Sequence, residues 1–220
     1  MNARLTPTLI FRWIVFLLAG FYCVIMVTTS EYDGFGGPFR FLTIWALFLS
    51  FFVASRHIAR MEARSTRRWE GLVAATAVVN FMVVFLYWKL FLEDPASVTR
   101  NGELGALWKE LYLHGLGPVL MWIDALFLHR GWRKVLPSVA WLTGIVATYL
   151  AWGELVLSPL NDTPIGSVTS GLPYPFLNSL EFPERLVFYA SNIALALAVL
   201  AVFTLLGRLL ARVLPGPGAP

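Results

Sequence analysis

The chain is poor in charged residues. Only 14% of its 220 residues are Asp, Glu, Lys or Arg, whereas soluble domains carry roughly 25%. Hydrophobic residues make up 58% of the chain, and the mean hydropathy is +0.69. This balance excludes an ordinary soluble globular domain and indicates a membrane protein.

Cysteine and histidine are also scarce. Cys23 is the only cysteine, which excludes an intrachain disulfide and a thiolate metal cluster. There are three histidines, of which His57 and His129 are expected at one membrane face and His114 near the other. A haem or zinc site built from all three is therefore not expected, and we predict neither a metal nor another cofactor.

Several sequence motifs are missing as well. The chain has no Gly-rich phosphate loop, no G-x-S-x-G nucleophile elbow and no evident internal repeat. No basic stretch is interleaved with stacking aromatic residues, so nucleic-acid binding is not expected. The expected partners at this point are membrane lipids, and no oligomeric state is predicted.

The apolar residues fall into separate blocks of about 20 residues, the length that crosses a hydrocarbon core of roughly 30 Å. The first block is too long for a removable signal peptide and lacks a small-residue cleavage site. We predict an all-α, polytopic bundle of six transmembrane helices that forms one domain over residues 1–214, followed by a flexible tail at 215–220. The predicted spans are Ile10–Thr29, Phe41–His57, Leu72–Phe91, Leu111–Leu128, Val135–Leu157 and Leu186–Leu209.

The distribution of charge predicts the orientation, because positively charged loops are retained in the cytoplasm. Basic residues flank both termini and fill the connections after spans two and four, whereas acidic residues fill the alternate connections. Both termini are therefore predicted to be cytoplasmic. The basic group is Arg4, Arg12, Arg56, Arg60, Arg64, Arg67, Arg68, Arg130, Arg133, Lys134, Arg208 and Arg212, and the acidic group is Glu31, Asp33, Glu93, Asp94, Asp162, Glu181 and Glu184.

The net charge of +4 follows from this topology and adds some attraction to anionic lipid headgroups. The chain has 14 arginines and three lysines, a ratio typical of a GC-rich bacterial genome. We therefore expect a bacterial inner membrane, or the endoplasmic reticulum or another internal membrane if the source is eukaryotic.

His114 is the only histidine well inside a predicted span. An ionisable side chain is costly within a bilayer, so it usually faces the protein interior and serves a site or a polar contact. Thr43 lies about one helical turn below the same non-cytoplasmic surface. Because a hydroxyl nucleophile needs a nearby base, Thr43 and His114 are candidates for covalent catalysis. The alternative is that His114 only hydrogen-bonds a neighbouring helix.

Other polar side chains are predicted at the same depth, namely Lys89, Trp152, Glu154 and Arg185. This number of polar groups in one layer indicates a cavity open to the outer leaflet. The alternative is that they anchor the helices at the interface, and we favour that interpretation for Lys89 and Arg185.

Three short motifs carry a family resemblance. The run Phe35–Thr43 resembles the Gly-Gly, then basic-aromatic-Leu-Thr segment of the androgen-induced and androgen-dependent membrane protein family. His114 and Asp124, ten residues apart, repeat the family's spacing between its catalytic histidine and an acidic residue, and Gly171–Leu177 is similar to its segment before the last span. Family members are transmembrane threonine hydrolases of fatty acid esters of hydroxy fatty acids. The resemblance implies that Thr43 is the nucleophile and His114 the base.

One feature departs from the family's animal members. These have an Asn-His-x-x-His arrangement, whereas this chain has one histidine in the run 113–117. Aligning His114 with the first histidine would place Gly117 at the catalytic position and remove the base. The spacing to Asp124 favours aligning His114 with the catalytic histidine, in agreement with bacterial members that have a His, Pro, Asp pattern such as His114, Pro118 and Asp124.

A third residue would orient the imidazole of His114. Glu110 lies one turn earlier on the same helical face, although a surface-exposed position explains it more simply. Glu154 and Tyr149 could reach from span five. Asp124 lies roughly 15 Å from His114 along a continuous helix, so it cannot contact the imidazole.

Three further polar residues, Asn80, Asn192 and Tyr174, complete the candidate pocket. Asn80 or Asn192 is expected to make a buried contact with Asp124. Tyr174, between Pro173 and Pro175, is expected in a rigid loop that lines the entrance to the cavity.

The sequence therefore favours an intramembrane lipid ester hydrolase. A non-catalytic protein that binds or transports a hydrophobic ligand in the same cavity is the main alternative. A proton-coupled transporter in which His114 and Asp124 titrate is a third, although no inverted repeat supports it.

Overall fold

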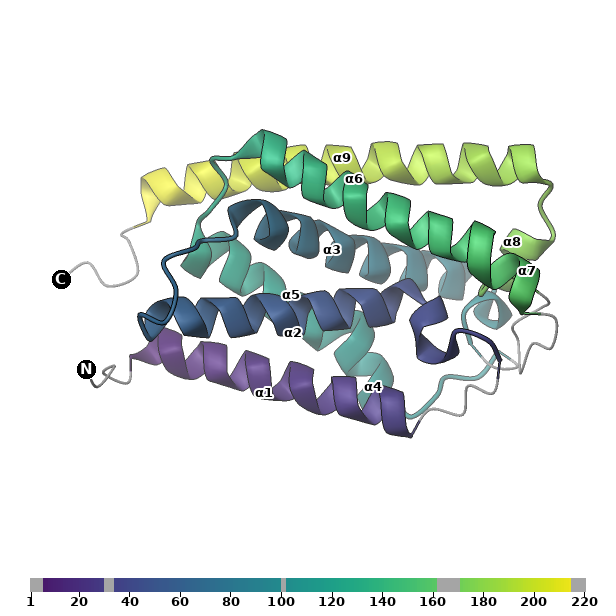
Figure 1. Cartoon of the computed structure of the whole chain (residues 1–220), viewed down its shortest axis with the longest axis horizontal. Helices are drawn as coiled ribbons and strands as arrows, with labels where there is room; N and C mark the ends of the chain where they lie inside the picture. Colours follow the sequence, from purple (N-terminus) through teal and green to yellow (C-terminus); the bar gives the residue numbers. More distant parts are fainter. Residues whose placement is uncertain (1–5, 30–33, 100–101, 162–170, 215–220) are drawn as a thin grey trace.

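The computed structural model describes residues 6–29, 34–99, 102–161 and 171–214. Arg4, Glu31, Asp33 and Asp162, which contributed to the predicted orientation, lie outside these ranges, as does the predicted tail at 215–220. The described residues form helices and connecting turns with no β-strand (Figure 1). The all-α prediction is confirmed.

Six helical segments are long and apolar enough to cross a membrane, as predicted. Most extend beyond the predicted limits by about one turn or less, because helices continue past the apolar core into the interface. Spans one, two, three and six are the helices α1 (Pro7–Thr28), α2 (Leu42–Met61), α3 (Glu70–Glu93) and α9 (Phe182–Val213).

The fourth and fifth spans are interrupted helices. The fourth, Leu107–His129, consists of α4 (Leu107–Leu111), a π-helical turn η3 (Tyr112–Leu116), α5 (Gly117–Ile123) and a second π-helical segment η4 (Asp124–His129). The fifth, Val135–Leu160, consists of α6 (Val135–Ala151), the π-helical segment η5 (Trp152–Leu157) and α7 (Ser158–Leu160). The short helices η1 (Gly37–Arg40), η2 (Pro95–Ser97) and α8 (Pro175–Asn178) lie in connections.

Helix α3 lies at the centre of the bundle and is its most buried span. It packs against α2, α5, α6 and α9, while α1 packs on the outside of α2 (Figure 1). The small side chains of Ala74, Ala75 and Ala77 are fully buried, and such residues let neighbouring helices approach closely in a membrane. The most buried span is therefore also the one with many small residues.

The bundle has two ends that are used below as reference points. The Thr43 end holds the start of α2, the end of α3 and the start of α9, and the Asp124 end is the opposite one. Helix α1 begins and α9 ends at the Asp124 end (Figure 1). Which end faces the cytoplasm remains a prediction from the charge distribution.

Candidate active site

The break in the fourth span positions His114. This residue has φ −111° and ψ 16°, outside the helical region, within the π-helical turn η3. Pro118 lacks the N–H that would bond the carbonyl of His114 in a regular helix. The indole N–H of Trp88 donates to that carbonyl instead, at 2.9 Å. The expectation of a continuous fourth helix was wrong, and the π-turn is of the kind found at functional sites.

Thr43 and His114 are in contact. Thr43 is the second residue of α2, and its Oγ1 lies 3.4 Å from Nε2 of His114. Their separation of 71 residues in the sequence places them on different helices at the same depth, as the sequence predicted. The distance is slightly long for a hydrogen bond, as is common between a nucleophile and its base when no substrate is bound.

Glu110 completes a chain of three polar side chains. Its Oε2 lies 2.9 Å from Nδ1 of His114, and only 20% of its side chain is exposed. The expectation that Glu110 is a surface residue was therefore wrong, because its helix face is turned toward the cavity and its carboxylate contacts His114. An ionised carboxylate only accepts hydrogen bonds, so Nδ1 of His114 carries the proton and Nε2 is left to accept one from Thr43.

Tyr87 contacts both Glu110 and His114. Its hydroxyl donates to Oε2 of Glu110 at 2.8 Å, and its ring stacks on the imidazole of His114 with centroids 3.5 Å apart and planes 4° apart. Sequence reasoning missed Tyr87, although it lies only two residues before Lys89, which was selected for its depth. We name Thr43, Tyr87, Glu110 and His114 the Thr43 cluster.

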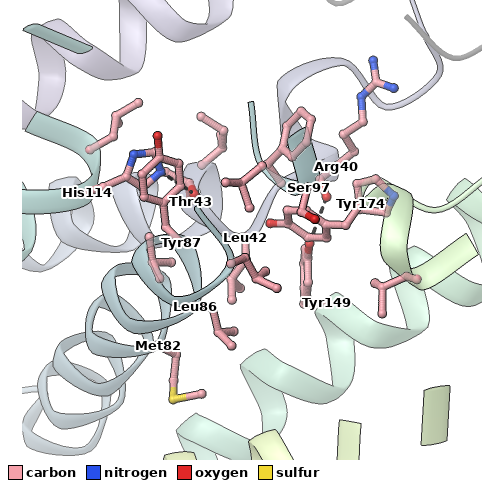
Figure 2. A pocket seen from close by; sticks show the side chains of 18 of the residues that line it. Arg40, Leu42, Thr43, Met82, Leu86, Tyr87, Ser97, His114, Tyr149 and Tyr174 are labelled. Carbon is pink, nitrogen blue, oxygen red and sulfur yellow. Dashed lines mark hydrogen bonds between the residues drawn. The ribbon is translucent and has the colours of Figure 1, made fainter. Parts of the chain in front are cut away.

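The Thr43 cluster opens into a cavity of about 760 Å³ (Figure 2). This volume is within the range of sites that hold small molecules. Apolar side chains from α3, α6 and α9 form much of the wall, including Met82, Leu86, Leu142, Val146 and Ile193. The cavity therefore suits an apolar ligand that presents a polar group to Thr43.

The cavity wall includes only some of the polar residues selected from the sequence. Besides Thr43 and His114, it is lined by Glu110, Tyr149, Tyr174 and Asn192. The candidates that do not line it are Asn80, Lys89, Asp124, Trp152, Glu154 and Arg185.

Four of these six candidates have structural contacts near the Thr43 end. Glu154 accepts hydrogen bonds from Arg185 at 2.9 Å and from Tyr189 at 2.6 Å, and therefore it does not orient His114. Arg185, expected as an interfacial anchor, forms this ion pair instead. Exposed Lys89 pairs with Glu93, and the indole N–H of Trp152 donates to the carbonyl of Phe39.

Tyr149 does not bond His114 either, because its hydroxyl donates to the carbonyl of Arg40 at 3.0 Å. It lines the cavity without contacting His114, so Glu110 is the residue that orients the imidazole.

The glycine pair before α2 has a structural role. Gly36 has φ 83°, and a Cβ there would lie 2.5 Å from Cδ2 of Leu157. The N–H of Gly37 donates to the carbonyl of Gly34 at 3.1 Å. That amide is therefore hydrogen-bonded within the turn before α2.

Asp124 belongs to a second buried cluster at the opposite end of the bundle. Its carboxylate pairs with Arg12 at 2.8 Å and with His57 at 3.1 Å. The ring of His57 stacks on that of His129, with centroids 4.7 Å apart. We name these four residues the Asp124 cluster. They tie α1, α2 and η4 together.

The predicted partners of Asp124 were wrong. The amide of Asn80 donates to Ser50 and to the carbonyl of Thr76, both at 2.9 Å. The amide of Asn192 donates to the carbonyl of Phe188 at 2.8 Å. Among the described residues, no group of three or more His, Cys, Asp or Glu side chains is placed to hold a metal ion.

The chain was compared with known protein families, curated proteins and solved structures. The family model described as FAR-17a/AIG1-like protein matches residues 7–211. Neither the curated proteins nor the solved structures contain a match to this chain.

Proposed function

The chain belongs to the FAR-17a/AIG1-like family, and from that premise we propose that it hydrolyses lipid esters within the membrane, with Thr43 as nucleophile and His114 as base. The observation that carries this proposal is the hydrogen-bonded series Thr43, His114 and Glu110 at the wall of an apolar cavity. A nucleophile, a base and a residue that orients the base are the parts that covalent ester hydrolysis requires.

In the acylation step, Nε2 of His114 takes the proton of the Thr43 hydroxyl while Oγ1 attacks the ester carbonyl carbon. The carboxylate of Glu110 stabilises the imidazolium that forms. Collapse of the tetrahedral intermediate breaks the ester bond, and the leaving alkoxide takes the proton from His114. An alcohol departs, and Thr43 retains the acyl group.

The deacylation step repeats this chemistry with water. His114 removes a proton from a water molecule that attacks the acyl carbon, and the proton then returns to Oγ1 of Thr43. The free carboxylic acid is released, and the cluster regains its starting state.

The apolar wall supports a substrate with a long hydrocarbon chain. The family resemblance implies fatty acid esters of hydroxy fatty acids or similar lipid esters. In this proposal the chain of the acid lies among Met82, Leu142, Val146 and Ile193, where apolar contact stabilises it without polar partners.

The same cavity also favours a second candidate, which is non-catalytic binding of a hydrophobic ligand. A binding protein needs the cavity but has no use for the ordered Thr43 cluster. The transporter alternative has less support, because His114 and Asp124 lie in separate clusters without a shared polar contact.

The first test is labelling of the purified protein in detergent with a lipophilic fluorophosphonate, followed by peptide mapping. We expect an adduct on Thr43 that is absent from Thr43→Ala and His114→Ala. Ester turnover should fall by about 10⁴-fold or more in Thr43→Ala. Thr148→Ala is the matched control, because the Thr148 hydroxyl is exposed and bonds only within α6. A Thr43→Ala variant with unchanged turnover would refute the mechanism.

A further inference from the structure

The loop that carries Tyr174 is held by side-chain hydrogen bonds from Asn161 and Asn178. The Asn178 amide donates to the carbonyls of Leu172 and Tyr174, at 2.9 and 3.3 Å, and accepts from the N–H of Leu172 at 3.0 Å. The side-chain amide of buried Asn161 donates to the carbonyl of Gly171 at 3.0 Å, and the backbone carbonyl of Asn161 accepts from the N–H of Gly171 at 2.6 Å. The backbone on both sides of Tyr174 is therefore closely fixed.

The side chain of Tyr174 extends from this loop into the cavity beside Tyr149, on the side of Thr43 (Figure 2). The flanking residues Pro173 and Pro175 restrict its backbone further. Its ring packs edge-on against Phe41, with centroids 5.8 Å apart. Phe41 directly precedes α2, so this contact places the phenol at the end of α2 that holds Thr43.

The phenols of Tyr174 and Tyr149 lie beside each other at the cavity wall (Figure 2). Tyr149 donates its single proton to the carbonyl of Arg40. Rotation about the C–O bond of Tyr174 would direct the proton of its own hydroxyl toward a ligand without moving the ring.

A phenylalanine would fill the same space and keep the contact with Phe41. A hydroxyl in a largely apolar cavity is useful only if it serves a polar group. The polar group that a lipid ester brings to this place is its carbonyl, because Thr43 must attack it here. The N-terminus of α2 adds a favourable field for negative charge at this point.

We propose that Tyr174 is a catalytic residue whose hydroxyl donates a hydrogen bond to the substrate carbonyl oxygen as Thr43 attacks. This inference rests on the proposed function. When Oγ1 of Thr43 bonds to the carbonyl carbon, the π electron pair moves to the carbonyl oxygen, and Tyr174 stabilises the resulting oxyanion. The pair returns when the ester bond breaks, and the proton stays on Tyr174 throughout.

The test compares kcat and KM of the wild type, Tyr174→Phe and Tyr22→Phe in detergent micelles with p-nitrophenyl laurate. Removal of one oxyanion donor should lower kcat by about 10²-fold while KM stays within about two-fold. Tyr22→Phe is the matched control, because its hydroxyl donates to the carbonyl of Trp108 and does not line the cavity. We expect wild-type kinetics for this control.

A second measurement separates catalysis from packing. The melting temperature of Tyr174→Phe and its affinity for the non-hydrolysable dodecyl phenyl ether should match those of the wild type. An equal loss of ether affinity and turnover would assign Tyr174 a purely structural role and overturn the inference. A Tyr174→Phe variant with wild-type kcat would also overturn it, while leaving the proposed function intact. A wild-type protein without turnover or Thr43 labelling would overturn both.

Discussion

The Thr43 and Asp124 clusters use similar residues in opposite ways. Each contains a buried histidine beside a carboxylate, and each depends on a π-helical part of the fourth span. The Thr43 cluster adds a hydroxyl and lines a cavity of about 760 Å³. The Asp124 cluster adds the guanidinium of Arg12, and Asp124 is only 2% exposed.

This difference shows why a buried histidine and acid are insufficient evidence for catalysis. In the Asp124 cluster the carboxylate is neutralised by Arg12 and contacts His57, so its charge is used to join helices. In the Thr43 cluster the only acid, Glu110, binds Nδ1 of His114, the ring nitrogen that does not contact Thr43. Nε2 of His114 is then available to the Thr43 hydroxyl, which a substrate can reach from the cavity.

The largest expected effect is the loss of protein stability in Asp124→Ala, which tests the structural role of the Asp124 cluster. Asp124→Ala leaves Arg12 and His57 buried without their partner, and loss of one member of a buried ion pair costs about 3–5 kcal/mol. We expect a markedly lower melting temperature in detergent, with turnover per folded molecule within about two-fold of the wild type.

The matched control replaces both charges. Arg12→Leu/Asp124→Leu should recover at least half of the lost melting temperature, because apolar residues of similar volume can substitute for a buried pair. A stable Asp124→Ala protein with strongly reduced turnover would instead connect the two clusters functionally.

Glu110→Gln should have the opposite effect, a loss of turnover with little loss of stability. Glutamine preserves the size of the side chain but removes the charge that stabilises the imidazolium of His114, so kcat should fall by about 10²-fold. The melting temperature should change little, since Glu110 remains partly exposed at the cavity. Steady-state kinetics and thermal unfolding of the same sample test this prediction. Equal effects of Glu110→Gln and Asp124→Ala on stability would abolish the proposed distinction.

A smaller loss is expected for Tyr87→Phe. The ring continues to stack on His114, but Glu110 loses one hydrogen bond of 2.8 Å. A single hydrogen bond to a charged group contributes about 1.5–3 kcal/mol. Only part of this stabilisation changes the activation free energy, because Tyr87 acts on the reaction indirectly, through Glu110. We therefore expect kcat to fall about five- to ten-fold with little change in KM. In the background of Glu110→Gln the same substitution should have less effect, and additive losses would argue against coupling through Glu110.

Sequence length and hydropathy predicted six spans, because crossing a bilayer requires about 20 apolar residues regardless of how helices pack. Depth along each span also placed Thr43 and His114 in one layer, since the rise per residue of a helix is nearly constant. The family assignment followed from short motifs near these residues, and the match over residues 7–211 supports it.

Only the tertiary structure decided which polar groups meet within a layer. Sequence spacing gives the depth of a residue but leaves the rotation and neighbours of each helix undetermined. Asp124 therefore pairs with Arg12, 112 residues away, in place of the expected Asn80 or Asn192. Pro118 and the π-turn interrupted the fourth span at His114, and helix packing turned the face that carries Glu110 and His114 toward the cavity. Packing against α3 then added Tyr87, which made a separated threonine and histidine into one ordered cluster.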